Sequence, residues 1–124
     1  MHGRHTFPQS HRLRYGHEFR RVYQGGRRWE GPLVVLYVRE LPPEELSPAG
    51  PCRRVGVVTS RRVGGAVVRN RARRLLREVY RLNQEKLRDN LEMVMIARSA
   101  LRGKRYPEVE GRMLSLFRAA GILK

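Results

Sequence analysis

The chain has 124 residues, 40% of them hydrophobic, so it is long enough to fold as one domain around a core, and wholesale disorder is not expected. Its formal net charge of +16 predicts strong, salt-sensitive attraction to nucleic acid or another anionic surface. A single cysteine, Cys52, excludes an internal disulfide and a multi-cysteine zinc site. The sequence has no long apolar run that could span a membrane and no apolar signal region, so we expect a cytoplasmic protein.

Arginine supplies 24 of the 27 basic residues. Guanidinium groups bind phosphate oxygens in pairs and stack on bases, so this bias suits an RNA ligand. Genome composition or adaptation to heat would produce the same bias, and the sequence does not separate these causes.

The N-terminal segment, residues 1–12, is polar, and we expect it to be flexible. It contains three of the four histidines, His2, His5 and His11. Their spacing matches no compact set of ligands, so the sequence predicts no metal site there.

Leu13–Tyr23 is predicted to form a short helix that ends at Gly25 and Gly26. Phe19 and Tyr23 are four residues apart and share one face of this helix. One interpretation buries both rings in the core. The other leaves them partly open among arginines, as a platform on which unpaired bases stack.

Three later segments have the apolar patterns of strands. Arg27–Glu40 is predicted to be one strand or a bent pair of strands, and Arg53–Ser60 and Glu92–Ala97 are predicted to be single strands. Residues 41–52 contain four of the seven prolines and are predicted to form a Pro-rich surface loop. A closing helix is predicted from Pro107 onward, with its apolar stripe ending near Gly121.

The most informative segment is a predicted helix from Ala66 to Leu82. Its apolar residues fall on one face: Val68, Ala72, Leu75, Leu76, Val79 and Leu82. Arginines follow one another at intervals of four on the other side: Arg69, Arg73, Arg77 and Arg81. Like charges at this spacing weaken an isolated helix, and an ordinary solvated face mixes charges of both signs. The pattern therefore indicates a docking surface for a polyanion.

The predicted order of elements is αβββαβα, which indicates a single α+β domain over residues 1–124, an α/β sandwich with helices covering a small central sheet. No GK[ST] motif follows the glycines Gly64 and Gly65, so nucleotide hydrolysis is not indicated. The eleven acids are scattered and form no evident carboxylate cluster of the kind that two-metal nucleases require.

Arg69-Asn70-Arg71, with the arginines that follow, resembles the RNR signature of the protein subunit of bacterial ribonuclease P. The resemblance runs from Leu13 to Ala120 and includes LRYGHEFRRVYQGG, LVVLY, RVGVVTSRRVG, MVMIAR and LSLFR in the expected order. It implies a fold similar to the second domain of ribosomal protein S5, with a left-handed βαβ crossover around the central helix. General rules would predict a right-handed crossover.

The resemblance also implies a function. The protein would be the non-catalytic subunit of an endoribonuclease, ribonuclease P, in which an RNA subunit carries the chemistry with Mg²⁺ held mainly by that RNA. It would bind the catalytic RNA and the 5′ leader of precursor tRNA, and promote removal of the leader in tRNA processing, with no DNA or membrane partner. Two alternatives remain: a ribosomal or other structural RNA-binding protein, and a stand-alone nuclease that uses the histidines.

The resemblance assigns residues to two surfaces. Residues expected to meet RNA are Arg61, Arg62, Arg69, Asn70, Arg71, Arg73, Arg74 and Arg77. Residues expected to line a cleft for the leader are Phe19, Tyr23, Tyr37 and Thr59. No residue is expected to be catalytic or to bind a metal. Gly65 stands where the family often has a polar residue, so we expect no side-chain cap on the central helix. The loop at residues 41–52 looks longer than the family requires, and no role is assigned to it.

Overall fold

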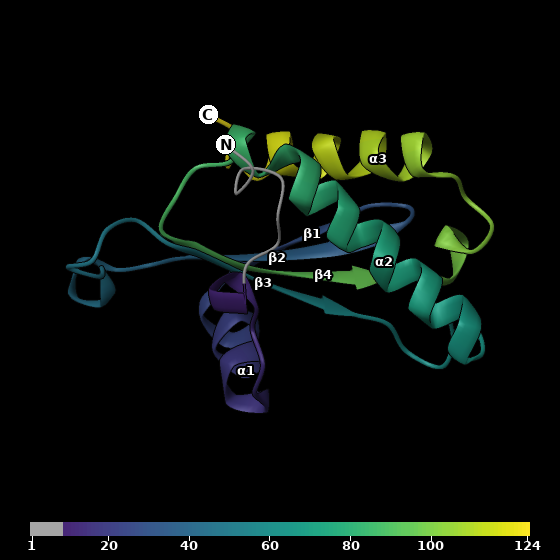
Figure 1. Ribbon diagram of the computed structural model, residues 1–124, viewed down its shortest axis with the longest axis horizontal. Helices are drawn as coiled ribbons and strands as arrows, with labels where there is room; N and C mark the ends of the chain where they lie inside the picture. The colour runs from purple at the N-terminus through teal and green to yellow at the C-terminus, as the bar shows by residue number, and fades with distance from the viewer. Residues whose placement is uncertain (1–8) are drawn as a thin grey trace.

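The computed structural model describes residues 9–124, so the predictions for His2 and His5 lie outside the described residues. The described chain forms three α-helices and four strands in the predicted order (Figure 1). They are α1 (Gly16–Gly25), β1 (Arg27–Glu30), β2 (Val34–Glu40), β3 (Arg53–Val58), α2 (Ala66–Asn83), β4 (Leu91–Ala97) and α3 (Tyr106–Ala119). None of these helices is long and apolar enough to cross a membrane.

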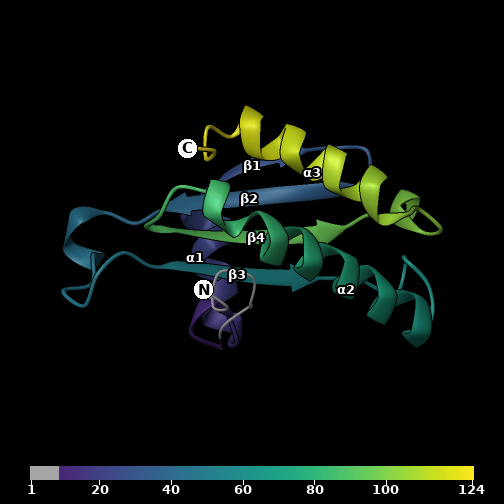
Figure 2. The same ribbon diagram turned by 45° about the horizontal axis from the view of Figure 1, so that its top comes forward.

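The four strands form one sheet in the order β1-β2-β4-β3. β2 is antiparallel to both β1 and β4, whereas β3 is parallel to β4 and is connected to it through α2. In Figure 2, α2 lies in front of the sheet, β3 and β4 both run from left to right, and β4 lies above β3, so the crossover is left-handed. The handedness implied by the family resemblance is therefore confirmed.

The helices divide between the two faces of the sheet (Figure 1). α2 and α3 cover one face and enclose the main core, to which alternate strand residues such as Leu36, Met93 and Met95 contribute fully buried side chains. α1 lies on the opposite face, where a smaller cluster forms around Val22 and Val94. The second face is only partly covered, so it leaves apolar side chains half-buried.

The buried face of α2 differs from the prediction at its C-terminal end. Leu82, predicted to be in the core, is 41% exposed, and Tyr80 is fully buried instead. Tyr80 can take this place because its hydroxyl is satisfied: it accepts a hydrogen bond from Arg53 Nε at 3.2 Å and lies 2.9 Å from His11 Nδ1. The hydrogen bonds at the Tyr80 hydroxyl make burial of this phenol favourable, and the apolar pattern of the sequence could not indicate them.

The last residues of the segment predicted to be flexible are docked. Gln9–His11 form a turn, and Arg12 pairs with Val55 beside the edge strand β3. The amide of Leu13 continues this pairing by donating to the Val55 carbonyl at 3.0 Å. An edge strand presents unpaired backbone groups, and the N-terminal segment satisfies some of them. Residues 9–12 therefore have defined contacts with the fold, and the flexibility of the segment stays a prediction.

Candidate nucleic-acid interface

α2 begins at Gly65, which has a backbone φ of −73° and makes no side-chain cap, as the sequence predicted. The Gly65 carbonyl accepts the first helical hydrogen bond, from the amide of Arg69, at 2.9 Å. Because the apolar side of the helix packs on the sheet, the arginines emerge on the other side. Arg61 and Arg62, in the turn before the helix, are exposed as well.

The basic residues of α2 keep their positive charge unneutralised. In residues 9–124, no carboxylate forms an ion pair with the set Arg61, Arg62, Arg69, Arg71, Arg73, Arg74 and Arg77, which together with Asn70 we call the arginine face. The fourth member of the predicted stripe, Arg81, differs, because it pairs with Glu78 at 2.7 Å. The surface predicted to dock a polyanion thus runs from Arg69 to Arg77, about two and a half helical turns.

Neutral acceptors, rather than acids, orient these guanidinium groups. Arg73 donates through Nη1 to Thr59 Oγ1 at 2.8 Å and through Nη2 to the Asn70 side-chain oxygen. Arg71 donates to the carbonyl of Lys104 at 2.7 Å. Such contacts fix the direction of a guanidinium group and leave its full charge available to a phosphate.

Arg77 lies where positive charge accumulates. Partial burial lowers its pKa, and the neighbouring guanidinium groups of Arg12 and Arg73 lower it further. An arginine remains charged in proteins despite such a shift. The part of the shift that comes from Arg12 and Arg73 reports a local excess of positive charge, which an anionic ligand would relieve.

The predicted leader residues of α1 and β2 meet on the partly covered face of the sheet. Phe19, Tyr23 and Tyr37 are half-buried there, and we call this set the aromatic face. The rings of Tyr23 and Tyr37 meet edge to face with centroids 4.8 Å apart. The Phe19 ring lies directly over Gly56 of β3, where a β-carbon would come within 2.7 Å of Phe19 Cζ. The two α1 rings are therefore partly open, as the second interpretation of the sequence required.

Thr59 follows the last residue of β3 and lies against Arg73. It therefore connects the edge strand of the sheet to the arginine face. The structure brings the predicted residues together as two surfaces, and Thr59, predicted to line the leader cleft, contacts the arginine face through Arg73 and has no described contact with Phe19, Tyr23 or Tyr37. Their contacts with RNA remain a prediction.

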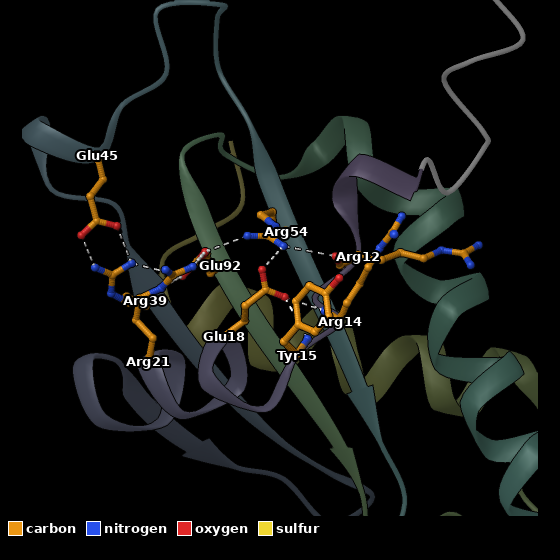
Figure 3. A network of polar contacts seen from close by, with 9 residues as sticks. All are labelled: Arg12, Arg14, Tyr15, Glu18, Arg21, Arg39, Glu45, Arg54 and Glu92. Atoms are coloured by element: carbon orange, nitrogen blue, oxygen red, sulfur yellow. Dashed lines mark hydrogen bonds and ion pairs between the residues drawn. The ribbon is translucent and has the colours of Figure 1, made fainter.

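A buried carboxylate holds α1 on the sheet (Figure 3). Glu92 of β4 is 2% exposed and accepts hydrogen bonds from Arg21 of α1, at 3.2 Å from Nε and 2.5 Å from Nη2. Arg39 of β2 donates to the same carboxylate at 3.1 Å, and Arg54 of β3 lies 4.0 Å away. Glu92 therefore ties the helix that carries the aromatic face to three strands.

Two further acids complete this network. Glu18 accepts hydrogen bonds from the amides of Arg14 and Tyr15 at 2.7 and 3.1 Å, and from Arg54 at 2.5 Å. Burial acts to raise the pKa of Glu18, but these donors outweigh it and lower the pKa to about 2. Glu45, from the Pro-rich loop, pairs with Arg39 at 2.6 Å, so the loop has a structural role that the sequence did not indicate.

Sequence reasoning missed this network, although one signal for it exists. Glu92 lies in an apolar strand and alternates with Met93 and Met95, so it must point to the face of Val94 and Ile96. A buried carboxylate is tolerated only when it is paired. Glu92 alone therefore predicts basic partners, but not which of the many arginines they are.

Within residues 9–124, no group of three His, Cys, Asp or Glu side chains is close enough to bind a divalent cation. The described protein residues therefore do not supply the carboxylate cluster that two-metal hydrolysis would need.

These features define a class: a small α+β RNA-binding protein that combines an unneutralised arginine face with a partly open aromatic face. The family model described as Ribonuclease P matches residues 7–121. The protein named ribonuclease P protein component in Clostridium acetobutylicum is 39% identical over 116 residues, covering 93% of this chain and 92% of the relative. Its namesake in Clostridium novyi is 37% identical, covering 92% of this chain and 96% of the relative. The chain belongs to the ribonuclease P protein family.

Solved structures give the same fold. The RNase P protein of Staphylococcus aureus superposes with a TM-score of 0.79 at 20% identity, covering 94% of this chain and 100% of the other. The RNase P protein of Thermotoga maritima superposes with a TM-score of 0.74 at 24% identity, covering 87% and 96%. At these identities the structures support the fold, and the sequence relatives support the family.

Proposed function

We propose that the chain binds the catalytic RNA of ribonuclease P through its arginine face and the 5′ leader of precursor tRNA through its aromatic face. Membership of the family makes it the protein subunit of this ribonucleoprotein enzyme, which acts in tRNA processing. Its partners are therefore an RNA and a tRNA substrate. The observation that carries the proposal is the arginine face, in which no arginine has a carboxylate partner within residues 9–124.

The two faces suit different parts of the task. Guanidinium groups contact phosphates of a folded RNA and supply affinity without reading its bases. Aromatic rings stack on unpaired bases of any identity, at about 1–3 kcal/mol per base. Leader sequences differ between precursors, so tolerant stacking is the appropriate way to hold them.

We propose that the chemistry, including the Mg²⁺, belongs to the RNA subunit. The protein residues described here assemble no set of metal ligands, and most of their carboxylates are engaged with the protein's own arginines. The role of the protein is then to bind and orient the substrate. The relatives are bacterial, and an RNA partner with a tRNA substrate makes the cytoplasm the proposed location.

The first test is cleavage of precursor tRNA by the RNA subunit at low Mg²⁺, with and without the protein. We expect the protein to raise the rate of leader removal. Arg77→Ala should weaken binding to the RNA subunit and reduce the salt dependence by about 0.7–0.9 log units per log unit of salt for each lost phosphate contact. The matched control is Arg112→Ala, which removes an exposed arginine from α3.

The same assay separates the alternatives. No gain in cleavage, with RNA binding intact, would favour a ribosomal or other structural RNA-binding protein. Cleavage at the mature 5′ end by the protein without RNA would establish a stand-alone nuclease. Equal salt dependence for wild type, Arg77→Ala and Arg112→Ala would remove the arginine face from the interface.

A further inference from the structure

An exposed pair of stacked rings stands at the start of α1. Tyr15 is 61% exposed, the most exposed large aromatic side chain in residues 9–124, and His17 is exposed beside it. The two rings lie parallel within 5°, with centroids 5.8 Å apart. Neither ring belongs to the residues that the family resemblance assigned to RNA.

The fold does not require the Tyr15 ring. The helix uses only its backbone: the Tyr15 carbonyl accepts from the amides of Glu18 and Phe19 at 3.0 and 3.3 Å, and its amide donates to the Glu18 carboxylate. Its hydroxyl makes no hydrogen bond to any residue in the range 9–124. A large ring that supports no core and no polar contact is available to a ligand.

The position of Tyr15 continues the aromatic face. Tyr15, Phe19 and Tyr23 follow one another at intervals of four residues, so each step advances about 6 Å along the helix. Phe19 is half-buried over the sheet, whereas Tyr15 lies further out, at the end of α1 where the chain enters from Arg12 (Figure 3). The three rings thus form a line of stacking positions that leads away from the sheet.

The charges around Tyr15 indicate which partner it suits. Arg14 and Arg20 are exposed next to it, and the Arg20 guanidinium lies over the first turn of α1 close to Gly16. Arg12, three residues earlier, contributes to the positive potential at Arg77 on the arginine face. Flat rings among exposed guanidinium groups match an unpaired nucleobase with its phosphates, and do not match a purely apolar protein surface.

We propose that the stacked pair Tyr15–His17 binds one further unpaired nucleobase of the leader, beyond the bases held at the aromatic face. The inference rests on the proposed function and adds a residue that sets how much of the leader is held. Tyr15 supplies the ring on which the base stacks, and His17 keeps that ring flat and oriented from behind. Arg14 and Arg20 neutralise the adjoining phosphates.

The test compares Tyr15→Ala with Tyr15→Phe in the enzyme reconstituted with its RNA subunit. Tyr15→Ala should weaken binding of precursor tRNA about five- to tenfold, near the lower end of what stacking one base contributes. It should leave the affinities for mature tRNA and for the RNA subunit unchanged. Tyr15→Phe, which keeps the ring, should bind precursor within about twofold of wild type. Because the ring is exposed, the midpoint of thermal unfolding should stay the same.

Abasic substitutions scanned along the leader locate the base. With wild-type protein, one leader position should lose affinity when its base is removed, and the same substitution should have no further effect in Tyr15→Ala. That position should differ from the one coupled to Phe19. Additive losses at every position, or equal losses for precursor and mature tRNA, would overturn the site.

Phe19→Ala distinguishes the failure of this inference from the failure of the proposed function. If Phe19→Ala reduces the preference for precursor over mature tRNA and Tyr15→Ala does not, the stacked pair binds no leader base and the proposed function stands. If neither variant changes that preference, both the leader role of the aromatic face and the additional site are wrong.

Discussion

Replacing Glu92 with glutamine tests whether a buried charge positions α1, the helix proposed to bind the leader. The substitution keeps the shape of the side chain and removes its charge. The wild-type carboxylate receives two hydrogen bonds from Arg21 and one from Arg39, and it is nearly inaccessible to water. A glutamine amide would still accept one of these bonds, but its NH₂ group would face guanidinium donors.

The expected loss of stability depends on whether the arginines that bind Glu92 can find other hydrogen-bond acceptors. Removing one member of a fully buried ion pair typically costs about 3–5 kcal/mol, because the other charge is left without a partner. Here the Arg21 side chain is 38% exposed and can regain water, and Arg39 keeps its bond to Glu45. We therefore expect Glu92→Gln to lower the free energy of unfolding by about 2–3 kcal/mol.

The functional consequence should be selective. Without the Glu92 carboxylate, α1 keeps its Glu18–Arg54 ion pair but loses its ionic attachment through Arg21, so Phe19 and Tyr23 should be held less firmly. Binding of precursor tRNA by the reconstituted enzyme should weaken, whereas binding of the RNA subunit to the arginine face should be retained. Urea unfolding measures the stability, and equilibrium binding of precursor and mature tRNA measures the selectivity.

Glu44→Gln is the matched control, because it makes the same change in net charge at an exposed residue of the Pro-rich loop. Its stability should remain within about 0.5 kcal/mol of wild type. The double variant Arg21→Gln with Glu92→Gln should be less destabilised than the sum of the single variants. Additive effects, or a cost for Glu92→Gln no larger than that of Glu44→Gln, would refute the positioning role.

Two further predictions concern the same region. Because the pKa of Glu18 is lowered from 4.5 to about 2, its carboxylate contributes stability above pH 4.5 that is lost as the pH falls towards 2. Acid titration should show a loss of about 2 kcal/mol in the free energy of unfolding, after allowance for solvent screening. Glu18→Gln should flatten the dependence of this free energy on pH, and an unchanged dependence would contradict the assignment. Gly56→Ala should displace the Phe19 ring, lower the free energy of unfolding by about 1–3 kcal/mol and weaken precursor binding. The control is Gly111→Ala, whose β-carbon would meet nothing within 4 Å and which should leave the stability unchanged or raise it. If Gly56→Ala changes neither stability nor binding, the ring can move freely.

The sequence predicts the elements well where one face of each is apolar and the other is not. The period of α2 fixes both its buried face and its arginine face, since the two are opposite sides of one pattern. Glycine and proline mark the ends of α1 and α3 with similar clarity. Leu82 and Tyr80 show the limit of this reasoning: near the end of a helix, the tertiary partners of a phenol decide which residue is buried.

Contacts between distant parts of the chain are what the sequence does not reveal. Arg21 and Glu92 are 71 positions apart, and any of the 24 arginines was an equal candidate for this carboxylate. Arg53 begins a predicted strand and nothing in the sequence sets it apart, yet it is buried and donates to the carbonyls of Gln84 and Leu87 at 2.8 and 3.0 Å. Such arginines cannot be told from RNA-binding ones by type or spacing, because only the fold decides which of them meet an acceptor inside the protein.

The distribution of acids, more than the number of arginines, shapes the surface. Carboxylates are paired with arginines of the sheet, of α1 and of the loops, and Glu78 pairs with Arg81 at the far end of α2. No carboxylate of residues 9–124 pairs with an arginine between Arg69 and Arg77. A chain with a net charge of +16 must tolerate repulsion somewhere, and here the repulsion is concentrated where neutral acceptors already orient the side chains. An RNA phosphate bound there, as proposed, would relieve like-charge repulsion as well as form contacts, so the same arrangement that weakens the free protein would strengthen the complex.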